Sequence, residues 1–228
     1  MKYQVYTETA ELRELCEKSI RETLEAGWLA PGKKATAVEN LLAEHFHMKN
    51  GCLVNSAKSA LLLSLAAYGV THGDYVKTDD FEGVIKFLGA VTTQNGSEKP
   101  KAQIVEGKKS TNIEKIAPIL IRHQENYLMD PLDAVDVEIF TLTNCCCVVI
   151  FKSKEIYNAV LRMRDWGRAG TQDEDFAGRY SQFVLGDTHY DWKFVFNELG
   201  FNFKSCEMAA SVCLESVKSI LASEEISL

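Results

Sequence analysis

The sequence predicts a single α/β domain over residues 1–228, with a mainly parallel sheet sandwiched by helices. Short apolar runs of strand length alternate with longer amphipathic runs, and this alternation is typical of a sheet that helices cover on both faces. The composition agrees with this prediction. With 46% hydrophobic residues among 228, the chain can bury the core of one large domain.

The helices are predicted from apolar residues at helical spacing. In the first helix, from Thr9 to Leu24, the apolar face consists of Leu12, Leu15, Ile20 and Leu24, and charged residues form the opposite face. The other predicted helices cover residues 37–46, 59–68, 81–87, 154–166 and 205–221, with a short helical turn at 112–116.

The strands are predicted from short apolar runs, several of them rich in β-branched and aromatic residues. These runs cover residues 51–55, 102–105, 117–121, 137–142 and 146–151. Val76, residues 81–87 and Val91 together indicate one further strand edge and the helix at 81–87. Two polar segments, residues 94–101 and 170–191, are predicted to be irregular, and the first of them is a surface loop.

Charge and cysteine usage exclude several classes of function. The net charge of -7 and the pI of about 5.3 argue against nucleic acid and anionic membranes as partners. We find no secretory signal and no apolar run that could span a bilayer, so we expect a cytoplasmic protein. The seven cysteines include no CxxC pair, and the adjacent Cys145, Cys146 and Cys147 alternate in direction, which indicates reduced thiols and no metal site.

Three stretches of the chain carry a family resemblance. They are Gly27-Trp28-Leu29 through Ser56-Ala57-Lys58-Ser59 to Gly73-Asp74, then Leu161 to Arg168, and then Gly200-Phe201-Asn202-Phe203-Lys204 running into Met208-Ala209-Ala210. In this order and spacing they resemble the DegT/StrS family of nucleotide-sugar aminotransferases and related deoxysugar dehydrases. The resemblance implies the large domain of the fold-type I transferases that depend on pyridoxal phosphate. It also implies that one helix and the C-terminal small domain are absent.

The resemblance implies a site for the cofactor phosphate at the start of the helix at 59–68. Ser56, Ala57, Lys58 and Ser59 occupy this place, where backbone N–H groups and the helix dipole favour a phosphate dianion. The family has Gly and then Thr or Ser where this chain has Ala57 and Lys58. An equally good interpretation is an N-cap serine and a solvated lysine.

Four further residues match cofactor-binding positions of the family. Asp130 matches the carboxylate that faces the pyridine nitrogen, and Asp133 matches a residue near the phenolic oxygen of the ring. Phe81 falls near the aromatic that stacks on the ring, and Asn202 matches the asparagine that reaches a cofactor phosphate across the dimer interface. The alternatives are a turn at Asp130, core packing for Phe81 and a tight turn at Asn202.

The residue that the chemistry of the family requires is missing. Aminotransfer proceeds through a lysine Schiff base, and the dehydrase branch uses histidine at the same place. The run from Thr141 to Phe151 contains neither residue. Lys152 is a weak substitute, because it follows the strand at 146–151 and is expected at the far end of that strand, away from the ring.

The second stretch of resemblance carries three arginines, Arg162, Arg164 and Arg168. They are interpreted either as contacts to a diphosphate or a partner subunit, or as a solvated helix end. One dehydrase branch carries an iron–sulfur cluster whose cysteines follow these arginines. Here residues 169–171 are Ala-Gly-Thr, so no iron–sulfur cluster is expected.

The sequence therefore supports two functions. The first is a degenerate homologue, a pseudoenzyme without transaminase activity that has a binding or structural role. It would act as a homodimer or as a heteromer with a full-length relative, with a nucleotide sugar as a candidate ligand. The second is an active aminotransferase or dehydrase, with pyridoxal phosphate held without a covalent link or through Lys152. A third interpretation is a fragment or a misassembled gene product.

Overall fold

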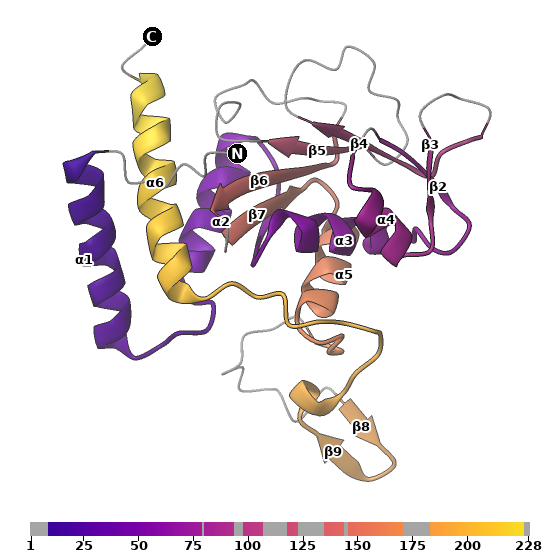
Figure 1. Ribbon diagram of the computed structural model, residues 1–228. Helices are drawn as coiled ribbons and strands as arrows, with labels where there is room; N and C mark the ends of the chain where they lie inside the picture. Colours follow the sequence, from indigo (N-terminus) through magenta and orange to yellow (C-terminus); the bar gives the residue numbers. More distant parts are fainter. Residues whose placement is uncertain are drawn as a thin grey trace.

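The computed structural model describes residues 9–78, 80–93, 98–106, 118–122, 135–143, 146–170 and 183–225. These residues form a seven-stranded sheet with helices on both faces, and a small two-stranded sheet lies apart from it (Figure 1). The strands are β1 (Asn50–Val54), β2 (Tyr75–Lys77), β3 (Val91–Thr93), β4 (Ala102–Glu106), β5 (Pro118–Arg122), β6 (Val137–Thr143) and β7 (Cys146–Phe151).

The order of strands in the large sheet is β1-β7-β6-β5-β4-β2-β3. Strand β7 is antiparallel to both of its neighbours, and the other four neighbouring pairs are parallel. The predicted α/β class with a mainly parallel sheet is thus confirmed. As a consequence, the carboxyl ends of β1 to β6 lie at one edge of the sheet, together with the amino end of β7.

Two apolar clusters, one on each face, hold the helices to the sheet. The first joins α3, α4 and α5 to one face, and the second joins α2 and α6 to the other. Strand β7 contributes alternate residues to both clusters, and all six of its residues are completely buried. The helices are α1 (Ala10–Ala26), α2 (Lys33–His45), α3 (Ala57–Ala67), α4 (Glu82–Phe87), α5 (Lys154–Arg164) and α6 (Glu207–Glu225).

The outermost helix, α1, lies beside α6 (Figure 1) and buries different residues from those predicted. Its buried residues are Cys16, Ser19 and Thr23, whose short side chains allow the two helices to approach closely. Leu15 and Leu24, which were predicted to lie on the buried face, are 46% and 55% exposed. They flank the buried stripe, because α6 covers only the centre of the apolar face.

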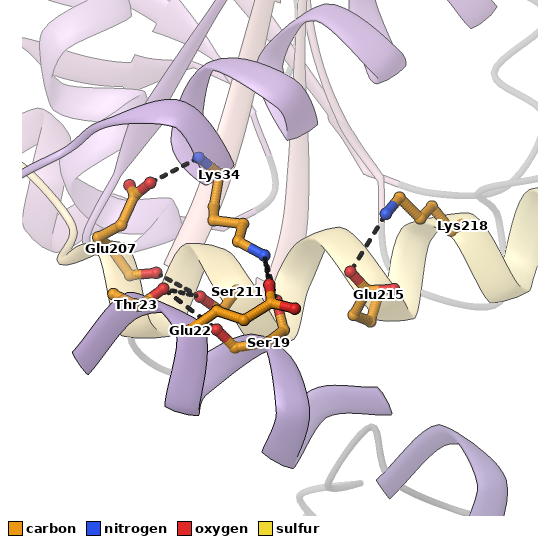
Figure 2. A network of polar contacts seen from close by, with 8 residues as sticks. All are labelled: Ser19, Glu22, Thr23, Lys34, Glu207, Ser211, Glu215 and Lys218. Atoms are coloured by element: carbon orange, nitrogen blue, oxygen red, sulfur yellow. Dashed lines mark hydrogen bonds and ion pairs between the residues drawn. The ribbon is translucent and has the colours of Figure 1, made fainter. Parts of the chain in front are cut away.

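A buried carboxylate joins α6 to α2, whose N-cap Gly32 has no side chain to cap the helix. The side chain of Glu207 accepts hydrogen bonds from the backbone N–H groups of Gly32 (2.7 Å), Lys34 (2.5 Å) and Ala35 (3.3 Å). Figure 2 shows how the Lys34 ammonium then reaches back to α1, where it pairs with Glu22 at 2.7 Å. The N-terminal ends of α2 and α6 are therefore fixed together, as the helix dipole favours.

The two-stranded sheet, β8 (Phe183–Leu185) and β9 (Thr188–Tyr190), lies in a segment that was predicted to be irregular. That prediction was wrong for this hairpin. A two-residue connection joins the strands, and Gly186 takes the left-handed conformation that such a tight turn requires (φ +60°). The hairpin projects from the main body below α5 in Figure 1.

Strand β1 is an edge strand, and two side chains satisfy the polar groups of its backbone. The Leu53 N–H donates to Glu39 Oε1 at 2.6 Å, and the Leu53 carbonyl accepts from Arg164 Nη1 at 2.8 Å. The two side chains are only 16% and 14% exposed, and their charged groups lie 3.6 Å apart. A Cβ atom on Gly51 would lie 2.5 Å from the Glu39 carbonyl, so α2 closes this edge at backbone contact.

The segment before α6 crosses the end of α5 so closely that the two backbones touch. Gly167 and Gly200 allow this contact because they have no side chain. Gly167 has φ +79°, and a Cβ atom on Gly200 would overlap the backbone of Gly167. At this crossing Asp165 and Asn202 form an isolated antiparallel bridge. The crossing therefore fixes the backbone position of Asn202.

Arg164→Met removes the cation of the buried pair and leaves the Glu39 carboxylate without its partner. We expect the free energy of unfolding to fall by about 3–5 kcal/mol, as for other broken buried pairs. Urea denaturation followed by circular dichroism measures this loss. As a control, Lys86→Met breaks the exposed pair with Glu82 and should cost less than about 0.5 kcal/mol. Equal losses in the two variants would contradict the role given to Arg164.

Gly167→Ala tests the backbone crossing, because the added Cβ atom would overlap the carbonyl oxygen of Glu198. Gly27→Ala is the matched control, since Gly27 also has a positive φ (+68°) but has no atom within 4 Å of an added Cβ. We expect Gly27→Ala to cost about 1–2 kcal/mol of stability, from backbone strain alone. Gly167→Ala should cost at least twice as much. Similar losses would show that the two segments can separate easily.

Candidate functional site

The candidate site lies at the edge of the sheet where the carboxyl ends of β1 to β6 meet the amino end of β7. The loop from β1 to α3 carries Ser56, and the loop from β2 to α4 carries Phe81. The β6–β7 connection reaches the same edge, because Thr143 pairs with Cys146 there. Ligands of parallel α/β sheets bind beyond the carboxyl ends of the strands, so this edge is the expected place for a ligand.

Ser56 is the N-cap of α3. Its backbone is extended (φ −165°, ψ 159°), and its Oγ atom accepts a hydrogen bond from the Ser59 N–H at 3.1 Å. The hydroxyl groups of Ser56 and Ser59 lie 2.8 Å apart, and Lys58 is exposed. This arrangement is the N-cap serine and solvated lysine given as one of the two interpretations. It also keeps two hydroxyl groups and a cation at the positive end of the helix dipole.

Asn202 lies close to this helix start within the same chain. The carbonyl of the next residue, Phe203, accepts a hydrogen bond from the Asn55 N–H at 2.8 Å. Asn202 is itself exposed and pairs through its backbone with Asp165. The structure thus brings the loop of Ser56 and the backbone of Asn202 together, although they are far apart in the sequence.

Phe81 precedes α4 with a left-handed backbone (φ +66°) and is partly buried against the apolar cluster that also contains α3. This contact is the core packing that was given as the alternative to stacking on a ring. Asp130 and Asp133, the predicted partners of the ring, lie outside the described residues.

The β6–β7 connection is two residues long and contains neither lysine nor histidine. Only Asn144 and Cys145 separate the paired residues Thr143 and Cys146, and the side chain of Cys146 is completely buried. No lysine or histidine occurs from residue 141 to residue 151. At this connection the chain therefore supplies no amine or imidazole that could meet the aldehyde of pyridoxal phosphate.

Lys152 lies at the opposite edge of the sheet. The register pairs Val54, two residues before Ser56, with Cys147, and it pairs Asn50 with Phe151. Cys147 and Phe151 are four positions apart along the strand, which corresponds to about 13 Å at 3.3 Å per residue. The Lys152 N–H donates to the carbonyl of Asp136, which precedes β6 at that far edge.

The three arginines at the end of α5 each pair with an acid. The partners are Glu198 for Arg162, Glu39 for Arg164 and Asp165 for Arg168. The interpretation as a solvated helix end is therefore wrong for Arg164 and Arg168, whose side chains are 14% and 15% exposed.

Two cations lie over the ring of Trp166, just beyond the same end of α5. The Lys204 ammonium lies 4.3 Å from the centre of the ring, and the Arg168 guanidinium lies 4.5 Å from it. Asp165 forms ion pairs with both cations. The sequence patterns did not indicate this cluster, because Lys204 is remote from Trp166 in the chain.

Burial governs the thiols near the site. It raises the pKa of Cys52 to about 12 and raises the pKa of Cys147 well above its usual value, so neither thiol is a ready nucleophile at neutral pH. Among the residues that the structure describes, no three side chains group to hold a metal ion. Within the same residues, no helix is long and apolar enough to cross a membrane.

Comparison with known proteins finds a family match over part of the chain. Residues 10–82 match the DegT/DnrJ/EryC1/StrS aminotransferase family. The spore coat polysaccharide biosynthesis protein SpsC of Bacillus subtilis (strain 168) is 41% identical over 61 residues, which are 27% of this chain and 16% of SpsC.

Two solved structures share the fold. NtdA from Bacillus subtilis, with bound cofactor PMP, matches with a TM-score of 0.70 and 16% identity, over 96% of this chain and 57% of NtdA. Helicobacter pylori PseC, an aminotransferase involved in the biosynthesis of pseudoaminic acid, matches with a TM-score of 0.69 and 16% identity, over 96% of this chain and 66% of PseC. This chain thus spans less than two thirds of either protein.

The resemblance inferred from the three sequence stretches is confirmed by these matches. The chain matches the DegT/DnrJ/EryC1/StrS aminotransferase family in sequence over residues 10–82, and it shares the fold of these two solved structures.

Proposed function

We propose that this protein is a pseudoenzyme of the family, with a binding or structural role and without transaminase activity. The observation that carries the proposal is the two-residue connection between β6 and β7, in a stretch from residue 141 to residue 151 that has no lysine or histidine. Lys152, the nearest amine in the sequence, follows β7 at the opposite edge of the sheet.

The chemistry of transamination explains why this absence matters. Pyridoxal phosphate supplies an electron sink, and the protein must supply an amine that holds the aldehyde and moves a proton. Here the first residues of β7, Cys146 and Cys147, are fully buried thiols. A buried cysteine acts as a small hydrophobe and cannot replace the amine. The residues at this connection therefore do not fit a covalently held cofactor.

The start of α3 supports a remaining capacity to bind a phosphate group. Ser56, Ser59 and the exposed Lys58 lie where the helix dipole attracts an anion. A phosphate-bearing ligand, such as a nucleotide sugar or free pyridoxal phosphate, suits this place. The same observation favours the second candidate function, a working aminotransferase or dehydrase that holds its cofactor without a covalent link or through Lys152.

We infer that the protein assembles with a second copy or with a full-length relative in the cytoplasm. Exposed apolar side chains support an assembly, because several gather on and after the β8–β9 hairpin. Their exposed fractions are 51% for Val184, 74% for Leu185, 74% for Phe194, 57% for Phe196 and 82% for Leu199.

Borohydride trapping distinguishes the pseudoenzyme from an enzyme that holds its cofactor through Lys152. The purified chain is mixed with pyridoxal phosphate, reduced with sodium borohydride and examined by intact mass, with Lys152→Ala as a variant and PseC as the positive control. We expect no added mass that resists denaturation in either form of this protein. A borohydride-fixed adduct that Lys152→Ala abolishes would establish the alternative function and exclude the pseudoenzyme.

A further inference from the structure

Trp166 has a backbone conformation that is unfavourable for a bulky residue. It follows the C-cap of α5 with φ +60°, and the next residue, Gly167, has φ +79°. Glycine or asparagine ends a helix in this left-handed region with little strain, whereas a residue with a large ring is strained there. Strained residues of this kind gather at functional sites. The conformation of Trp166 therefore indicates a role for its ring.

Two cations and the carboxylate of Asp165 hold this ring in place. The Lys204 ammonium and the Arg168 guanidinium, 4.3 Å and 4.5 Å from the ring centre, contact the same Asp165 oxygen, Oδ1, at 2.9 Å and 3.2 Å. The shared oxygen keeps the two cations within about 7.5 Å of each other, whereas directly opposite positions on the two ring faces would be about 9 Å apart. Both cations thus lie toward Asp165, and Trp166 remains 39% exposed.

Asn202 lies on the same side of its segment as Lys204. The rings of Phe201 and Phe203 stack with centres 4.8 Å apart and planes at 11°, so these two side chains share one side of the segment. Alternation then places Asn202 and Lys204 on the other side. The backbone of Asn202 forms its bridge with Asp165, which directly precedes the tryptophan. Since Asn202 is exposed, an accessible amide lies beside the accessible ring.

An exposed aromatic ring beside an amide suits a nucleobase. Every nucleobase has a π face that stacks on an aromatic side chain, whichever base it is. The amide of Asn202 has two donors and one acceptor oxygen, which match the polar edge of a base.

The distance from the ring to the loop of Ser56 separates a nucleotide from other phosphate-bearing ligands. The Asn55 N–H donates to the Phe203 carbonyl at 2.8 Å, and the Phe203 N–H donates to the Arg164 carbonyl at 3.1 Å. Residues 164–166 therefore lie two backbone spacings from this loop, which is about 10 Å at about 4.8 Å per spacing. A nucleoside diphosphate can span this distance, because its ribose separates the base from the phosphates. Pyridoxal phosphate cannot, since its phosphate is attached one carbon from the ring.

We propose that Trp166 stacks on the base of a nucleotide and that Asn202 contacts the edge of that base. Trp166 thereby selects nucleotides over other phosphate-bearing molecules. This proposal rests on one part of the proposed function, namely that the start of α3 binds a phosphate group. It is independent of whether the protein has transaminase activity.

The test titrates the full chain with uridine diphosphate, adenosine diphosphate and inorganic pyrophosphate, and measures affinity by isothermal titration calorimetry. Pyrophosphate is the matched probe, because it carries two phosphates and no base. We expect at least one of the two nucleotides to bind about tenfold or more tightly than pyrophosphate, because stacking on the ring adds to its affinity.

Variants at the ring separate stacking from folding. Trp166→Gly removes the ring and relieves the strained backbone, so the chain should remain folded by circular dichroism. Its nucleotide affinity should fall to the level of pyrophosphate, and its pyrophosphate affinity should stay unchanged. Trp166→Phe keeps an aromatic face and should restore nucleotide preference. Trp28→Ala is the matched control, because Trp28 is also half exposed but contacts the carbonyl of Pro31, and it should change neither affinity.

Fluorescence supplies a measurement that leaves Trp166 itself unchanged. The chain has three tryptophans, so the double variant Trp28→Phe/Trp192→Phe retains Trp166 alone. Stacking of a base on this ring should quench its fluorescence, with pyrophosphate as the blank.

Three outcomes overturn the proposal. They are equal affinities for pyrophosphate and both nucleotides, an unchanged nucleotide affinity in Trp166→Gly, and an unchanged fluorescence of Trp166 at saturating nucleotide. Absence of binding by all three probes would defeat the phosphate site together with this proposal. A borohydride-fixed adduct at Lys152 would exclude the pseudoenzyme and leave the nucleotide result as it stands, so the two failures are distinguishable.

Discussion

The edge of the sheet at β1 depends on one buried pair, Glu39 and Arg164, which together satisfy the N–H and the carbonyl of Leu53. Burial raises the pKa of Glu39 even though Arg164 lies beside it, so desolvation outweighs the attraction between the two charges. The pair therefore stabilises the fold through its hydrogen bonds to the backbone of Leu53, and not through the attraction between its charges. An edge strand with open polar groups would otherwise invite pairing with another chain.

The Glu39–Arg164 pair also lies next to both segments that form the candidate site. The loop with Ser56 begins at the end of β1, and Arg164 is the last residue of α5. Directly after it the chain crosses the segment of Asn202, which is held by the Asp165 bridge and by the hydrogen bond between Phe203 and Asn55. Closing the edge of the sheet thus also places the start of α3 beside the segment that precedes α6.

The order and type of most elements could be predicted from the sequence, because hydrophobic periodicity is local. The fully apolar run of β7 and the N-cap Ser56 are readable from neighbouring residues alone. Contacts between remote residues are not readable in this way. Leu53 and Arg164 are 111 residues apart, and no local pattern indicates that Glu39 joins them. The short polar side chains that α1 buries were missed for the same reason, since only α6 defines which stripe of α1 is covered.

The packing of β7 explains why the stability of this fold does not require an amine at the β6–β7 connection. The sheet is held by two apolar clusters, and β7 supplies both of them with completely buried residues. A lysine at the start of such a strand carries a desolvation penalty unless a ligand or a partner compensates for it. Cysteines at the same place carry no such penalty, because they pack as small hydrophobes. Stability and transamination therefore make separate demands on this edge, and the buried cysteines of β7 meet the demand of stability.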